Sequence, residues 1–285
     1  MLTISSAQMS AIGEAAAETL VMELVGHART ALPSAVVGCD DAAVAKATRT
    51  ALRRAMRLGW TTTGPARHYV ECALLFGCDV AHDPFHPWFA QGLASAATRA
   101  DGTHADAADA THAALLAAWP MLFGEDSQRL PRALDRLMRF DAVRAFDSTA
   151  MLETRIAEVL HLLYPGKWLA ASDAARQALA RAGVERCARG MHAATSGQIA
   201  CLQLYFGHGV LIDPLYGWVR ETLAPPRSSG NAVSGAVSNT VGKSASVSPL
   251  EQARLLMTQI RSYGAARLAA EMTELGEPTD AKGAR

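Results

Sequence analysis

A pattern of aromatic, glycine, aspartate, proline and tryptophan residues occurs twice in the chain, and it constrains the fold more than any other feature. The segment Leu74–Trp88 reappears as Leu204–Trp218 at a constant offset of 130 residues, with seven of the fifteen positions identical. The main shared residues are Phe76, Gly77, Asp83, Pro84 and Trp88 in the first copy, and Phe206, Gly207, Asp213, Pro214 and Trp218 in the second. Such a repeat predicts that one structural unit is present twice.

The repeat continues upstream with a shift of two residues. Asp41 aligns with Asp173, and Arg54 with Arg186, at an offset of 132. The change in offset falls in a turn after Gly59, where a length change is tolerated. We therefore predict a helical unit over residues 1–122, a connector helix within 123–144, a second unit over 145–272, and a disordered tail over 273–285. Two units are too few for a solenoid, which favours two tandem, internally duplicated bundles.

The composition favours an all-α fold. Half of the residues are hydrophobic but only 6% are aromatic, and the plentiful alanine carries the lowest cost in a helix. Capping residues and apolar spacing predict helices over 5–32, 40–58, 63–76, 83–93, 105–122, 126–142, 172–190, 195–207, 213–223 and 248–272. Leu152, Ile156, Val159 and Leu163 form the apolar face of another predicted helix.

Charge and cysteine content narrow the classes of function. The 27 basic and 27 acidic residues cancel, which argues against a nucleic-acid partner. No apolar run approaches the roughly 18 residues that a membrane span needs, and residues 1–9 lack the pattern of a signal peptide. The five cysteines contain no CxxC pair, which is typical of reduced thiols in a cytoplasmic protein.

Residues 224–249 differ from the rest of the second unit. They are rich in serine, glycine and valine, contain Pro225-Pro226, and carry only two charges. Unit one joins the equivalent helices with a short stretch. We predict a flexible insertion that folding does not require.

Several patterns resemble chemical sites, and each has a structural explanation that we favour. His82 and His86 have the spacing of metal ligands on a helix, but prolines interrupt that helix and the second copy lacks both histidines. Asp83 and Asp213 are explained by helix capping more readily than by acid–base catalysis. The Gly-Lys-Ser at 242–244 lacks the first glycine of a phosphate loop. Cys72 follows His68 by one helical turn but reads as a core thiol. We therefore predict no catalytic, metal or cofactor site.

A basic stripe remains as a candidate binding surface. Lys46, Arg49, Arg53 and Arg57 share one face of the predicted helix over 40–58. This face could bind an acidic surface of another protein, or it could simply be solvated.

Part of the sequence resembles a family of uncharacterised helical proteins of Gram-negative bacteria. The resemblance lies in Met1–Met9, Gly59–Arg67, Leu75–Gly77 and Asp83–Trp88, in order and spacing, and covers residues 1–95. Genes of that family tend to lie near type VI secretion and effector genes. The resemblance implies a protein partner, a secreted effector or toxin, rather than a substrate.

Three functions stay open at this point. The first is a non-enzymatic adaptor or chaperone for a type VI secretion effector. The second is an immunity protein that neutralises a cognate toxin. The third is an enzyme or toxin with an unrecognised His/Asp site. The sequence leaves the partner and the oligomeric state undetermined.

Overall fold

The structure, a computed structural model, describes residues 6–97, 104–123, 129–224 and 247–276. Within these ranges the secondary structure is helical throughout, without a strand, which confirms the all-α prediction. No helix in the same ranges combines the length and the apolar character needed to cross a membrane.

The first half of the chain forms five α-helices and two short 3-10 helices in the described residues. They are α1 (Ser6–Ala31), η1 (Pro33–Val36), α2 (Asp41–Arg57), α3 (Thr63–Phe76), η2 (Val80–His82), α4 (Pro87–Ala97) and α5 (His104–Phe123). Asp40 caps α2 by accepting a hydrogen bond from the Ala43 N–H at 2.7 Å. The predicted bounds of the first three α-helices are confirmed to within about two residues.

The second half follows a similar order. Its elements are α6 (Arg129–Arg139), α7 (Ala142–Ala145), α8 (Leu152–Leu163), α9 (Pro165–Ala170), α10 (Asp173–Ala188), α11 (Ala193–Phe206), η3 (Pro214–Tyr216), α12 (Gly217–Leu223) and α13 (Pro249–Gly276). The last helix extends past residue 272, where we predicted a tail to begin. The predicted insertion over 224–249 and the end of the predicted tail lie largely outside the described residues.

One predicted helix start is wrong, and a second is correct for a different type of helix. We expected helices to begin at Asp83 and Asp213. α4 begins only at Pro87, whereas Asp213 caps the 3-10 helix η3, which leads into α12 at Gly217. In each case the aspartate carboxylate accepts a hydrogen bond from the backbone N–H two residues on, at Phe85 and Leu215, which forms a tight turn before the α-helix.

Two smaller predictions also need correction. The connector is not one helix over 126–142, because Asp141 accepts from the Arg144 N–H and starts the separate helix α7. On α8 the core side is made by Leu152, Ile156, Leu160 and Leu163, and Val159 is only half-buried.

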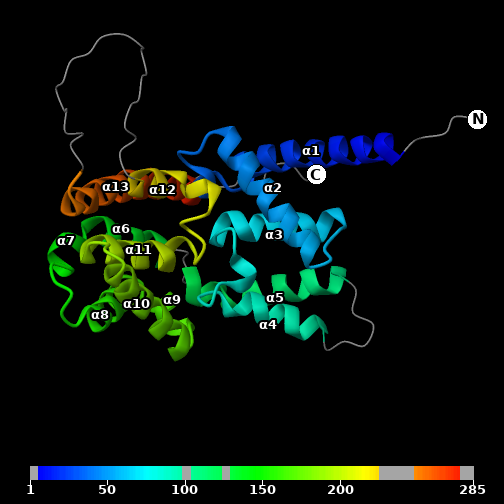
Figure 1. The fold of residues 1–285 in the computed structure, drawn as a ribbon. Coiled ribbons are helices and arrows are strands. Elements are labelled where there is room, and N and C mark those ends of the chain that lie inside the picture. Colours follow the sequence, from blue (N-terminus) through cyan, green and yellow to red (C-terminus); the bar gives the residue numbers. More distant parts are fainter. Residues whose placement is uncertain (1–5, 98–103, 124–128, 225–246, 277–285) are drawn as a thin grey trace, which may run out of the picture.

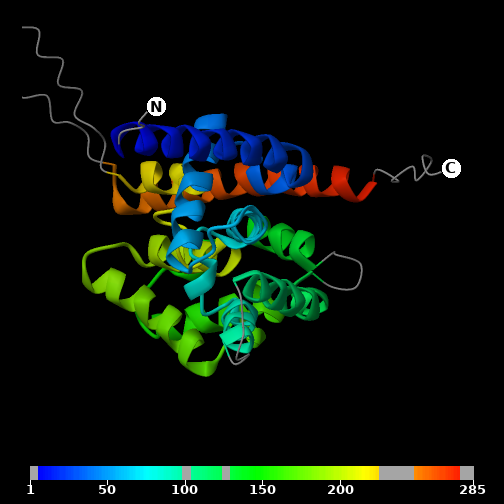
Figure 2. The ribbon, with the colours of Figure 1, turned by 90° about the vertical axis from the view of Figure 1, so that its right-hand side faces the viewer.

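The helices form one layer above two groups (Figures 1 and 2). α1, α12 and α13 run across the top in both views, with α3, α4 and α5 below on one side and α6 to α11 below on the other. Buried apolar residues from both halves belong to one continuous core cluster.

The two halves contact each other through several elements. η1 packs against α13, α2 packs against η3, and α5 packs against α9. The Tyr164 hydroxyl at the start of α9 donates to the Leu122 carbonyl of α5 at 2.8 Å. The halves are therefore joined by packing and by hydrogen bonds as well as by the connector.

Candidate functional site

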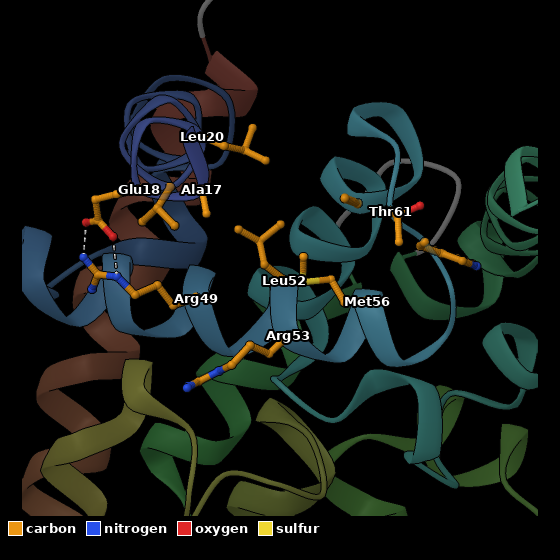
Figure 3. Close-up of a pocket in the computed structure, with 11 residues that line it drawn as sticks. Ala17, Glu18, Leu20, Arg49, Leu52, Arg53, Met56 and Thr61 are labelled. Atoms are coloured by element: carbon orange, nitrogen blue, oxygen red, sulfur yellow. Dashed lines mark hydrogen bonds and ion pairs between the residues drawn. The ribbon is translucent and has the colours of Figure 1, made fainter. Parts of the chain in front are cut away.

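An apolar groove lies between α1, α2 and the start of α3. It has a volume of about 350 Å³, and its walls carry Ala17, Leu20, Leu52, Met56, Thr61 and Ala66. Figure 3 shows Leu20 of α1 together with Leu52 and Met56 of α2 around the open space. The Met56 side chain is 60% exposed, so a large apolar group remains in contact with solvent here.

The sequence of α2 explains how the groove forms. Small residues, Ala47, Thr48, Ala51 and Ala55, make its fully buried face and allow close packing against the neighbouring helices. Leu52 and Met56 lie one helical turn apart, beside that face rather than within it. Trp60, which is 1% exposed, also lines the groove, and its backbone N–H donates to the Ala55 carbonyl.

One end of the groove is closed by an ion pair. The Arg49 guanidinium binds the Glu18 carboxylate, with the Nε–Oε2 hydrogen bond at 3.0 Å (Figure 3). This hydrogen bond lowers the pKa of Glu18 from its ordinary value. The pair connects α1 to α2 but lies in solvent, so its contribution to stability is small.

The predicted basic stripe lies beside this groove. Arg49 and Arg53 line it, whereas Lys46 and Arg57 are exposed on α2 and do not. In the described part of the chain, Lys46, Arg53 and Arg57 form no ion pair, and Arg53 only approaches the Thr50 hydroxyl at 3.5 Å. The groove therefore has one cation without an ion pair in its wall, Arg53, and two more, Lys46 and Arg57, beside it on α2.

The repeated segments lie against each other in the interior. The Asp83 carboxylate accepts from the His208 N–H at 2.7 Å, and the Asp213 carboxylate accepts from the Cys78 N–H at 2.7 Å. Cys78 and His208 occupy equivalent positions of the repeat. Each aspartate thus binds the segment that contains the other.

Glycines make this approach possible. Gly77 and Gly207 have φ values of 102° and 99°, and a Cβ added at Gly77 would lie 2.5 Å from the Phe206 carbonyl oxygen. A Cβ at Gly207 would collide in the same way with the Phe76 carbonyl oxygen. Both positions need a residue without a side chain.

The remaining residues of the repeat are mostly internal. Phe76, Trp88 and Phe206 are buried, Trp218 and Pro214 are half-buried, and Pro84 is exposed. The Trp88 indole N–H donates to His86 Nδ1 at 3.2 Å. None of these residues faces the groove, so the repeat and the basic stripe form two separate features.

The patterns that resemble chemical sites do not assemble into one. Within the described residues, no group of three or more His, Cys, Asp or Glu side chains is placed to hold a metal. His82 lies at the surface beside Asp79, while His86 is buried. Cys72 lies 3.7 Å from His68 Nε2, but burial raises the pKa of this thiol, which opposes formation of a nucleophilic thiolate. The Gly-Lys-Ser at 242–244 lies outside the described residues.

A buried polar cluster was missed by the sequence analysis. His86, Lys167 and Arg267 line a small cavity between the two halves, and Lys167 is 2% exposed. Burial lowers the pKa of Lys167 from 10.5 to about 8. The only sequence signal was a lysine within the apolar run Tyr164–Ala170.

Comparison of the chain with protein-family models, curated proteins and solved structures finds no match. The class of protein is therefore defined by its own geometry: over the described residues it is all-helical, with an open apolar groove beside basic side chains and a small cavity of mixed lining.

Proposed function

We propose that this chain is a non-enzymatic protein-interaction factor that binds an amphipathic helix of a partner in the groove between α1, α2 and α3. The observation that carries the proposal is the groove itself, where Met56 and half-buried Leu20 and Leu52 remain accessible. Grooves between helices commonly bind the apolar face of another helix.

The groove is hollow enough to hold apolar side chains of a partner helix. Its volume of about 350 Å³ is within the range of binding pockets, and helix anchors at i, i+4 and i+7 would place apolar groups along it. Met56 adds an unbranched, adaptable side chain, which is common at such binding surfaces.

The positive charge in and beside the groove indicates what charge the partner helix should carry. Lys46, Arg53 and Arg57 present three cations without partners in the described residues. The partner helix should therefore carry Glu or Asp beside its apolar face. Such complementarity raises the association rate and rejects basic helices more than it adds affinity.

The family resemblance supports a narrower role, that of an adaptor or chaperone for a type VI secretion effector. In this role the protein would bind the effector in the cytoplasm before secretion, through an exposed effector helix. Immunity against a cognate toxin and an enzymatic activity are distinguished from it by the test below.

We also propose that the chain arose by internal duplication and consists of two related bundles. Support comes from the matched order of the α-helices, α2–α3–α4–α5 in the first half and α10–α11–α12–α13 in the second. The reciprocal bonds of Asp83 and Asp213 support it further.

The test is affinity capture from host cells with the full chain and two matched variants. Met56→Glu places a carboxylate in the groove, and Met151→Glu makes the same change at a methionine that is 74% exposed outside the groove. We expect one partner to bind the wild type and Met151→Glu, with roughly 30-fold weaker binding to Met56→Glu. Equal binding of the partner by all three proteins would contradict the proposal that the groove is the binding site.

The effects of deleting the gene, and of producing the protein alone, then distinguish an adaptor from an immunity protein and from an enzyme or toxin. An adaptor should lose effector secretion on deletion without harm to the cell. Deletion that is lethal only when a toxin gene is present would indicate immunity, and toxicity of the chain itself would indicate an enzyme or toxin.

A further inference from the structure

The small cavity between the two halves is lined by apolar side chains and by polar groups in similar measure. Its volume is about 20 Å³, which gives room for one water molecule or one ion of halide size. Leu75, Phe76, Leu122 and Leu130 supply the apolar walls, and the polar lining comes from His86, Tyr164, Lys167, Tyr205 and Arg267.

His86 presents an unpaired N–H in this buried region. Its Nδ1 accepts from the Trp88 indole N–H, so the neutral ring carries its proton on Nε2. Burial lowers the pKa of His86 well below its ordinary value, which keeps the ring neutral. The Nε2 atom is buried and has no hydrogen-bond partner in the described structure.

Lys167 presents a buried ammonium on which the negative charge of the Asp83 carboxylate acts, but without an ion pair between the two side chains. It forms no ion pair or hydrogen bond with any described residue, although it is 2% exposed. The nearby carboxylates are already engaged. Asp83 accepts two backbone N–H bonds, and Glu271 binds Arg267 at 2.9 Å.

The tyrosine hydroxyl hydrogens are also committed elsewhere. Tyr164 donates to the Leu122 carbonyl and Tyr205 to the Ala133 carbonyl, both at 2.8 Å. The donors left toward the cavity are the His86 N–H and the Lys167 ammonium, beside the Arg267 guanidinium. A water molecule could accept from them, but an anion would accept from both donors and would also be attracted by the buried positive charges of Lys167 and Arg267.

We infer that this cavity binds one small monovalent anion, chloride in practice, between His86 Nε2 and Lys167 Nζ. The anion accepts hydrogen bonds from these two buried groups and lies beside the positive charges of Lys167 and Arg267. Its role is structural, since the cavity joins α3, α5, α9, α11 and α13 from both halves. It does not depend on the proposed groove function.

The test compares thermal unfolding of the full chain in sodium chloride, sodium bromide and sodium gluconate at equal ionic strength. Gluconate is too large for the cavity. We expect chloride and bromide to raise Tm in a saturable manner, by roughly 3 °C at a twentyfold excess over Kd. An identical Tm in all three salts would overturn the proposal.

Two lysine variants test whether the difference in Tm between salts arises at this cavity. Lys167→Met should abolish the difference between chloride and gluconate, and Lys46→Met, at an exposed lysine, should retain it. A difference that persists in Lys167→Met would place the anion elsewhere and contradict the proposal.

Crystals of the wild type grown in bromide give a readout that does not depend on any variant folding. An anomalous peak between His86 and Lys167 is expected. Its absence at that position, with water in its place, would overturn the assignment.

Discussion

Asp83 and Asp213 each satisfy two backbone N–H groups with one carboxylate. One bond is local, to Phe85 or Leu215, and the other crosses to the opposite segment, at His208 or Cys78. A carboxylate has two acceptor oxygens, which suits this double role better than a hydroxyl does. The aspartates therefore join the halves as well as shaping their own turns.

Replacing either aspartate by alanine should cost more than loss of an ordinary cap. Asp83→Ala leaves the buried Phe85 N–H and the part-buried His208 N–H unpaired, and Asp213→Ala leaves the buried Leu215 and Cys78 N–H groups unpaired. Each should lower the free energy of unfolding by about 3 kcal/mol. Asp40→Ala, which removes one exposed cap bond, should cost about 1 kcal/mol. Urea unfolding of the three variants measures the difference, and equal losses would contradict the joining role.

Lys167 should make stability depend on pH in a specific direction. Its folded pKa of about 8 is below its ordinary 10.5, so the unfolded chain binds the proton more tightly. The native state is therefore penalised fully below pH 8, the penalty fades as the pH rises from 8 to 10.5, and it is absent above that range.

Lys167→Met should remove this penalty. In gluconate buffer we expect the variant to be more stable than the wild type by about 3 kcal/mol at pH 7, with no such advantage near pH 10.5. Lys46→Met, at an exposed position, should show no comparable trend. Chemical unfolding at several pH values measures the difference, and a gap that does not change with pH would show that Lys167 is not desolvated as described.

At the scale of elements, the crossing of the two Phe-Gly corners depends on the absence of side chains. Gly77→Ala would combine an unfavourable φ with a backbone collision, and should destabilise the protein by about 3 kcal/mol or more. Gly190 provides the control, because its φ is 94° but nothing lies within 4 Å of an added Cβ. Gly190→Ala should therefore cost only about 1 kcal/mol from strain. Thermal unfolding separates the two, and equal costs would show that the contact between corners is unimportant.

Local signals predicted most helices but not the details of their packing. Asp40, with apolar spacing, was sufficient for α2, because capping and periodicity act within one helix. The start of α4 was misplaced, and Asp213 caps the 3-10 helix η3 rather than α12. Both aspartates also bind a segment more than a hundred residues away, which no local pattern records. On α8 the choice between Val159 and Leu160 depends on which neighbouring helices cover that side.

The groove could be predicted only in part from the sequence, because residues of different helices form it. The charges of α2 formed a visible stripe, but the apolar half of the site needs Leu20 of α1 beside Leu52 and Met56. The buried Lys167 could not be distinguished from a surface lysine without the fold.

At the scale of the whole molecule, the contacts between halves bear on how the chain unfolds. α5 with α9, η1 with α13, and α2 with η3 all join residues from opposite halves. We expect fragments 1–144 and 145–285 to lack cooperative thermal transitions when separate, and to regain one when mixed. Circular dichroism melts measure this. A sharp transition in either fragment alone would favour two independently folding bundles.

The groove between α1, α2 and α3 is proposed to bind an acidic amphipathic helix of another protein. The most direct measurement places a photo-cross-linking amino acid at position 56, and in a matched control at position 151, in host cells. Cross-linked peptides are then identified by mass spectrometry. If the groove binds this helix, position 56 but not position 151 should cross-link to one acidic helical segment of a single partner. Arg53→Glu should abolish this cross-linked product. Absence of a cross-link from position 56, or the same products from position 151, would contradict this proposal.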